Sequence, residues 1–137
     1  WGKHSPFERA VRSALIIRVP GVSKVGLQTN ALAETVDLYP TLVDVCRPTF
    51  QKTHQPLDGV SLTPVLTGES SAVRDAAVSY WRDAVSVRSN THRLIARRSK
   101  DTVTPVAVYD LSKQSDSVDN VAEANPEIVE SLLKHVR

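Results

Sequence analysis

Residues 76 to 98, AAVSYWRDAVSVRSNTHRLIARR, contain three short apolar runs that are separated by polar links. In order, the runs and links are 76–81, Arg82-Asp83, 84–88, 89–92 and 93–98. Links of two to five residues are the lengths that join neighbouring antiparallel strands in hairpins. The stretch therefore predicts three strands of an antiparallel meander.

A fourth apolar run and a terminal helix extend this subdomain. The run covers 106–111, and the helix is predicted from Asn125-Pro126-Glu127. Asn125 suits the N-cap, Pro126 the first helical position, and Glu127 the positive end of the helix dipole. The apolar stripe that follows is Ile128, Val129, Leu132, Leu133 and Val136. We expect an α+β fold in which a four-stranded antiparallel sheet packs against a C-terminal helix.

The upstream residues predict the edge of a larger α/β domain. The apolar run 14–19 ends at Pro20-Gly21 and is typical of a buried strand. Apolar side chains at helical spacing predict a helix over 36–46, with Pro40 either in its first turn or at a kink. The expected organisation is the end of an α/β domain (1–48), a connecting loop (49–75) and the antiparallel subdomain (76–137).

Composition excludes several classes of protein. A net charge of +2 over 137 residues gives no concentrated basic face for nucleic acid. No apolar run approaches the roughly 20 residues that span a bilayer, so neither nucleic acid nor a membrane is an expected partner. Cys46 is the single cysteine, and its apolar neighbours predict a buried side chain rather than a nucleophile. The four histidines show no metal-binding spacing.

Five groups of short motifs follow one another along the chain. They are WGKHSPFE (1–8) with LIIRVPG (15–21), VDLYPTL (36–42), LDGVSL (57–62) with LTG (66–68), VSVRS (85–89) with RLI (93–95), and VYDL (108–111) with DNVA (119–122). Each is weak alone, but their order resembles the C-terminal portion of sulfatases. Within that alkaline-phosphatase-like superfamily the iduronate-2-sulfatase-like branch is the most similar.

The resemblance implies an enzyme that hydrolyses sulfate esters with a formylglycine, beside a calcium ion held by carboxylates. No formylglycine signature surrounds Cys46, and no metal ligand is identifiable, so both are expected upstream in a missing N-terminal catalytic domain. We therefore expect this chain to be an inactive fragment that binds no metal by itself. The resemblance further implies a sulfated carbohydrate substrate and an exported protein, whether periplasmic, extracellular or lysosomal.

The N-terminal motif supplies the candidate site residues. Lys3 matches the sulfatase lysine that contacts the sulfate group, and its ammonium would neutralise charge on the sulfate oxygens. His4 and Trp1 are candidate substrate-binding residues beside it. Glu8 and Arg12 are expected to brace the segment that presents Lys3.

A further candidate for substrate binding is His92, in the predicted hairpin loop. Arg88 and Arg93 lie close to it in the sequence, and guanidinium groups pair well with carboxylate and sulfate. We expect these three side chains to be able to reach an acidic sugar.

Two alternative functions remain open at this point. The first is a non-catalytic module that binds polyanions through a basic strip containing Arg93, Arg97 and Arg98. The second is a fragment of a related phosphodiesterase, which a different nucleophile in the upstream sequence would identify.

Overall fold

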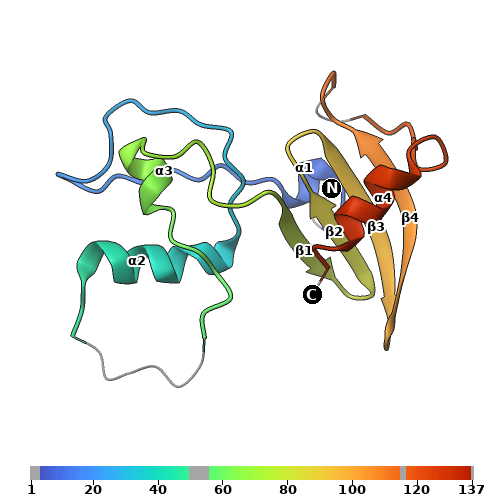
Figure 1. Ribbon diagram of the computed structural model, residues 1–137, viewed down its shortest axis with the longest axis horizontal. Helices are drawn as coiled ribbons and strands as arrows, with labels where there is room; N and C mark the ends of the chain where they lie inside the picture. The colour runs from blue at the N-terminus through green and yellow to red at the C-terminus, as the bar shows by residue number, and fades with distance from the viewer. Residues whose placement is uncertain (1–3, 50–55, 115–116, 137) are drawn as a thin grey trace. The chain divides into compact units, whose positions relative to one another are not determined.

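The computed structural model describes residues 4–49, 56–114 and 117–136 (Figure 1). By internal contacts the chain divides into two compact units, the first formed by Trp1–Ala14 with Ala76–Arg137 and the second by Leu15–Asp75. The helices are α1 (Glu8–Val11), the 3₁₀ helix η1 (Thr35–Asp37), α2 (Leu38–Cys46), α3 (Thr63–Thr67) and α4 (Pro126–Leu133). The strands are β1 (Ala77–Trp81), β2 (Ala84–Arg88), β3 (His92–Ser99) and β4 (Thr102–Asp110). Within the described ranges, no helix has the length and apolar character needed to cross a membrane.

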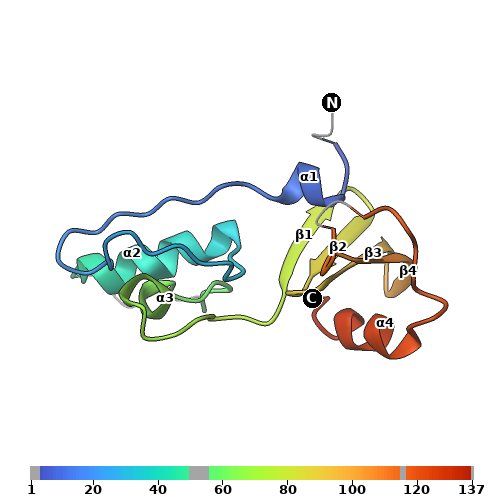
Figure 2. The same ribbon diagram turned by 90° about the horizontal axis from the view of Figure 1, so that it is seen from above.

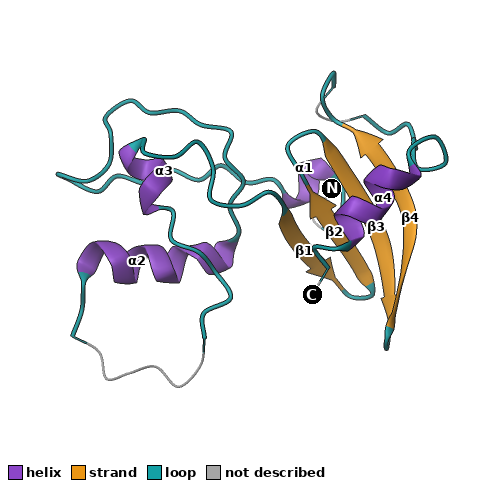
Figure 3. Ribbon diagram, viewed as in Figure 1, coloured by secondary structure: helices purple, strands orange, loops and turns teal. Residues whose placement is uncertain are grey.

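The first unit contains the predicted meander. Its sheet has the order β1-β2-β3-β4, and each neighbouring pair is antiparallel (Figure 3). Trp81 pairs with Ala84 around the two-residue loop Arg82-Asp83. The α+β fold class and the four-stranded sheet are therefore confirmed.

The last strand begins earlier than the sequence pattern indicates. The prediction placed its start at residue 106, but β4 begins at Thr102 and includes Pro105. A proline cannot donate to a strand ladder, and this one is tolerated because β4 is an edge strand. The register changes beside it, because Ile95 pairs with Ala107 and Ala96 with Pro105, leaving a bulge in β4.

Helix α4 covers one face of the sheet. Alternate strand residues point toward it, and Leu132 of α4 joins them in the core, which contains Ala76, Val85, Val87, Leu94, Ala96, Val108 and Leu132. Figure 2 places α4 and α1 on opposite sides of the sheet. Pro126 occupies the first turn as expected, but Asn125 makes no side-chain capping bond. Its Nδ2 instead donates to the Val121 carbonyl at 2.8 Å.

The strand predicted over 14–19 is not formed. Residues 12–19 have no regular secondary structure, and Leu15 and Ile16 are 49% and 92% exposed. Hydrophobicity indicated a buried strand, but a strand also needs a partner for its backbone groups. None of the four described strands pairs with this run. The assignment of 1–48 to a larger α/β domain stays a prediction.

The predicted helix over 36–46 is found as η1 followed by α2. Pro40 lies in the first turn of α2, so the helix begins near it and the alternative of a kink at Pro40 is not needed. The prediction that Cys46 is buried is wrong, because its side chain is exposed at the end of the helix. Tyr39 and Leu42 are also exposed, whereas Thr41 and Asp37 are buried. The residues that are fully buried in η1 and α2 are therefore polar.

Candidate functional site

The N-terminal segment lies on the sheet face opposite α4. Antiparallel register aligns Ala77, Arg88, Arg93 and Tyr109 across the four strands, so these side chains share one face. Glu8 of α1 reaches two of these residues, and Phe7 contacts a third. The segment that carries the candidate residues is thus anchored to the sheet.

Glu8 forms the centre of this anchor. Its Oε2 accepts hydrogen bonds from Arg93 Nε at 2.9 Å, Arg93 Nη2 at 2.5 Å and Arg88 Nε at 3.1 Å. Arg93 also donates to the Ser86 hydroxyl. Glu8, Arg93 and Ser86 are all buried, whereas Arg12 is largely exposed and lies 4.0 Å from Glu8 Oε1. Bonding through two N–H groups of Arg93 fixes the position of the carboxylate strongly.

The buried position of Arg93 has an electrostatic cost. Burial lowers the pKa of its guanidinium, while the hydrogen bonds and the negative charge of Glu8 oppose that shift. Arginine remains protonated in proteins, so the group stays a cation. The cluster can hold two segments of chain together, but its carboxylate is occupied by two guanidinium groups and is not available as a general base.

Two ring contacts extend the anchor along the segment. The ring centroid of His4 lies 4.9 Å from that of Trp81, with an interplanar angle of 30°. The ring centroid of Phe7 lies 5.6 Å from that of Tyr109. Burial raises the pKa of the Tyr109 hydroxyl. Residues 4 to 8 are therefore attached to the sheet at both ends.

The two candidate residues that the structure describes, His4 and His92, do not lie together. Lys3 and Trp1 lie outside the described residues. His4 contacts the C-terminal end of β1, whereas His92 begins β3, at the opposite end of the sheet because these two strands run in the same direction. His92 contacts the Thr91 hydroxyl through Nδ1 at 2.9 Å.

The expectation that Arg88 and Arg93 reach a sugar together with His92 needs correction, whereas His92 itself stays a candidate. Arg88 and Arg93 both donate to Glu8 on the face beneath the N-terminal segment, so neither guanidinium is available to a sugar. The two arginines pair across β2 and β3 and share a sheet face, but no local pattern indicated that a carboxylate 80 or 85 residues away would occupy it. The charged group beside His92 is Asp110, whose pKa is lowered chiefly by hydrogen bonds from Ser112.

In the second unit, the VDLYPTL and LDGVSL motifs are connected by hydrogen bonds. Asp37 is fully buried, and its carboxylate accepts hydrogen bonds from the Glu34 N–H at 2.7 Å, the Val60 N–H at 2.9 Å and the Arg74 guanidinium. Arg74 also forms an ion pair with Glu34 at 2.7 Å. The VDLYPTL and LDGVSL motifs are therefore held together by their polar residues, and Arg74 is a partner that sequence reasoning missed.

The same two motifs meet at Thr41. Its buried hydroxyl donates to the Asp37 carbonyl at 2.6 Å and accepts from the Leu62 N–H at 2.8 Å. One turn along the helix, Asp44 accepts from the Ser61 hydroxyl at 2.8 Å. Hydrogen bonds from Thr63 and Ser61 lower the pKa of this exposed carboxyl. These contacts are structural, and nothing in them resembles a reaction centre.

Gly59 should not tolerate a side chain, because the backbone of η1 passes directly against it. A Cβ at this position would overlap the Val36 carbonyl oxygen and lie 2.9 Å from the Asp37 nitrogen. We expect Gly59→Ala to destabilise the second unit by about 1–3 kcal/mol, as overpacking typically does. Urea denaturation followed by circular dichroism measures the loss. Gly26→Ala is the matched control, because an added Cβ there meets no atom within 4 Å and only its positive φ of 72° opposes it. An equal or smaller loss for Gly59→Ala than for this control would contradict the close approach.

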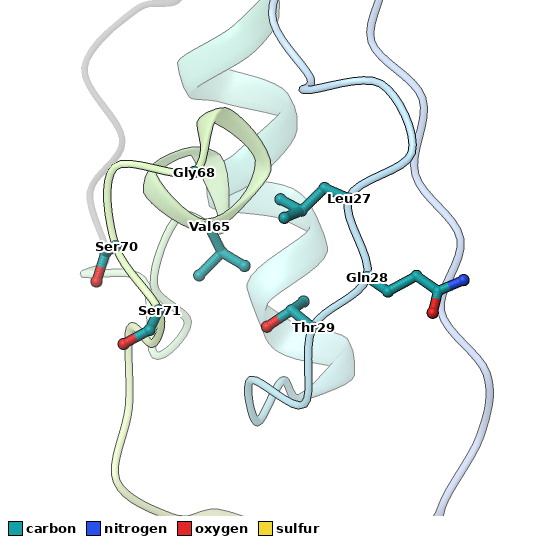
Figure 4. A pocket seen from close by; sticks show the side chains of 7 residues that line it. All are labelled: Leu27, Gln28, Thr29, Val65, Gly68, Ser70 and Ser71. Carbon is teal, nitrogen blue, oxygen red and sulfur yellow. The ribbon is translucent and has the colours of Figure 1, made fainter.

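The second unit also contains a shallow pocket of about 270 Å³ between the 27–29 loop and α3 (Figure 4). It is lined by Leu27, Gln28, Thr29, Val65, Gly68, Ser70 and Ser71, none of which is ionisable. In the close-up the Gln28 amide extends away from the other labelled side chains. The pocket therefore lacks the groups needed for acid–base or metal chemistry.

No metal site is found in the described part of the chain, and the basic strip expected from Arg93, Arg97 and Arg98 is not formed by all three. No group of three or more His, Cys, Asp or Glu residues is placed to hold a metal ion. Of the three arginines expected in the strip, Arg93 is buried and Arg97 is bonded to Asp83 at 2.6 Å. Two of the three guanidinium groups are therefore engaged within the protein, and the three arginines do not form one exposed surface for a polyanion.

Sequence comparisons with curated proteins identify relatives of this chain. No protein-family model matches the chain. Arylsulfatase K of Gallus gallus is 32% identical over 148 aligned residues, which cover 98% of this chain and 27% of that protein. The extracellular sulfatase SULF-1 homolog of Drosophila melanogaster is 37% identical over 99 residues, covering 71% of this chain and 8% of that protein. Human N-acetylglucosamine-6-sulfatase is 31% identical over 91 residues, covering 65% of this chain and 16% of that protein.

A solved structure supports the fold. The structure of BT4656 in complex with its substrate D-glucosamine-2-N,6-O-disulfate aligns with a TM-score of 0.69 and 22% identity, over 87% of this chain and 26% of that one. The chain spans about a quarter of the length of arylsulfatase K. The comparisons support sulfatases as a family, but not the iduronate-2-sulfatase-like branch in particular. The chain belongs to the sulfatase family and corresponds to a C-terminal portion of its members.

Proposed function

We propose that the protein containing this chain hydrolyses sulfate esters of a sulfated sugar. The observation that carries the proposal is the similarity to arylsulfatase K over 98% of the chain. The substrate class is supported by the glucosamine disulfate named for the structural neighbour and by the N-acetylglucosamine-6-sulfatase relative. The name of the Drosophila relative, an extracellular sulfatase, also supports an exported protein.

Within this reaction we assign Lys3 to the sulfate group. An ammonium near the reacting centre would stabilise negative charge that grows on the sulfate oxygens and the leaving oxygen. Support comes from the anchor downstream of it, because Glu8 and the His4 and Phe7 ring contacts hold the following residues on the sheet. Glu8 is a positioning residue in this proposal, and His4 and Trp1 are candidates for contact with the sugar.

The formylglycine and the metal are assigned to the rest of the protein. No described residues of this chain fit a metal, so no step of the reaction is assigned to a metal held by this chain. In sulfatases calcium is the expected ion. The partner of the chain is then the remaining, N-terminal catalytic part of the same protein. The second unit has exposed apolar side chains, among them Ile16, Tyr39 and Leu42. The N-terminal catalytic part of the protein would pack against these side chains.

The proposal is tested by assaying the full-length protein with an aryl sulfate such as 4-methylumbelliferyl sulfate. We expect turnover by the full-length protein and none by residues 1–137 alone. Lys3→Ala in the full-length protein is expected to lower kcat by about 10²–10³-fold, the usual effect of removing one group that stabilises the transition state. Lys24→Ala, a lysine of the second unit, is the control and should leave kcat unchanged. Hydrolysis of an aryl phosphate diester but not of the sulfate would favour the phosphodiesterase alternative instead.

A further inference from the structure

The loop that joins β1 to β2 has an unusual first residue. Arg82 has a positive φ of 53°, a conformation that glycine adopts more easily than any residue with a side chain. It follows Trp81, which closes the strand and is 38% exposed. The hairpin therefore presents a long cation and a large aromatic ring side by side at its tip.

The charge of Arg82 is not neutralised by the hairpin. The neighbouring Asp83 accepts a hydrogen bond from Arg97 at 2.6 Å, so the acid of this loop is already paired. Among the residues that the structure describes, no Asp or Glu forms an ion pair with Arg82. Its guanidinium carbon lies 5.7 Å from the centroid of the Trp81 ring, within the range of a cation–π contact.

His4 approaches the same indole. Its ring centroid is 4.9 Å from that of Trp81, and its side chain is exposed. A guanidinium and an imidazole thus both approach one ring, and both can donate hydrogen bonds to an oxyanion. All three residues belong to the first unit, and Glu8 fixes the segment that carries His4.

We propose that Arg82, His4 and Trp81 form a subsite for an anionic group of the saccharide other than the sulfate that is cleaved. The inference rests on the proposed function, because it uses the position of His4 directly after Lys3. A carboxylate is planar and a sulfate is tetrahedral, and a guanidinium can bind either group through two N–H donors. The subsite would make the enzyme prefer a sugar that carries a second charge over one that carries the scissile sulfate alone.

The chain contains a matched control for this subsite. Lys100 begins the loop between β3 and β4 with a φ of 45°, is followed by Asp101, and is exposed. It therefore shares the loop position, backbone conformation and charge of Arg82, but no aromatic contact is found for it within the described residues. An effect due to surface charge alone should appear in both variants.

The test uses the full-length protein and two substrates. One is a sulfated disaccharide that contains a uronate, and the other is 4-methylumbelliferyl sulfate, which has no second anionic group. Arg82→Ala is expected to raise KM for the disaccharide about tenfold, the effect of losing one charge-assisted contact, with kcat unchanged. For the aryl sulfate its kcat/KM should stay within about twofold of wild type. Lys100→Ala should change neither, and Arg82→Lys should recover part of the disaccharide affinity.

Substrate analogues identify the anion. The difference between wild type and Arg82→Ala should disappear with a carboxyl-reduced disaccharide if the carboxylate is bound, or with one that lacks the second sulfate if that group is bound. The inference is overturned if Arg82→Ala matches wild type on the disaccharide, or if it weakens both substrates equally.

The failure of this inference and that of the proposed function can be told apart. Suppose that the full-length protein hydrolyses the aryl sulfate and that Arg82→Ala does not change KM for the disaccharide. The subsite inference is then wrong, and the proposed sulfatase function still holds. If the full-length protein hydrolyses neither substrate, the proposed function fails, and calorimetric titration with the disaccharide decides about the subsite. Binding that Arg82→Ala weakens about tenfold would support it, and equal or absent binding would overturn it.

Discussion

Replacing Glu8 with Ala is expected to lower the free energy of unfolding of the first unit by about 3–5 kcal/mol. The reason is the group left behind, because Arg93 is only 4% exposed and would keep its charge without a carboxylate partner. Ser86 would remain as a neutral acceptor, which cannot replace the ion pair. Equilibrium urea denaturation, followed by the tryptophan fluorescence of the chain, to which Trp81 in the sheet contributes, measures the change.

Two further variants separate the buried contact from a surface one. Arg12→Ala removes an exposed partner that lies 4.0 Å from Glu8, and should cost less than about 0.5 kcal/mol. The double variant Glu8→Met with Arg93→Met removes both buried charges. It should be more stable than Glu8→Ala because the buried Arg93 charge is no longer left unpaired, whereas Arg88 loses the same carboxylate in both variants. If Glu8→Ala were as mild as Arg12→Ala, the carboxylate would not be the anchor of the N-terminal segment.

The strands and the terminal helix were predictable because their signals are local. Turn residues at short intervals define the β1–β2 and β2–β3 hairpins, and Pro126 marks the start of α4. The start of β4 was missed because proline argues against a strand unless the strand is known to lie at an edge. That knowledge requires the sheet order, which no local pattern supplies.

Other features depended on partners that are distant in the sequence. The run 14–19 and Cys46 are apolar enough for a core, yet Leu15, Ile16 and Cys46 are exposed. The apolar character of a segment indicates that it can be buried, but it does not identify the part of the protein that would pack against it. In the same way, Glu8 was expected to brace the N-terminal segment, but its partners on β2 and β3 are visible only in the folded sheet.

The motifs of the second unit show a different limit. Their order predicted the family, but the sequence alone did not indicate what Asp37, Thr41 and Gly59 do. In the structure Asp37 and Thr41 accept backbone N–H groups from the neighbouring motif, and Gly59 allows the two backbones to touch. Family resemblance therefore identified residues whose role is architectural, which is a reason not to assign chemistry to a residue only because a motif contains it.

Asp37→Ala is accordingly expected to destabilise the second unit by about 3–5 kcal/mol. The change would leave the Arg74 guanidinium, whose side chain is 7% exposed, without its buried carboxylate, although Glu34 still pairs with it. It would also leave the N–H groups of Glu34 and Val60 without their acceptor. Urea denaturation gives the total loss, and hydrogen exchange of these two amides gives its location.

The substitutions at Asp37 and Thr41 distinguish the charge from the hydrogen bonds. Asp37→Asn keeps one carbonyl acceptor but removes the charge, and should fall between wild type and Asp37→Ala. Thr41→Val preserves the shape but leaves the Leu62 N–H without its acceptor, at a cost of about 1–3 kcal/mol, whereas Thr41→Ser should retain most of the stability. Slow exchange of the Val60 amide in Asp37→Ala would mean that another group accepts it. In that case the polar contacts between the two motifs would follow from the packing of this unit and would not be its cause.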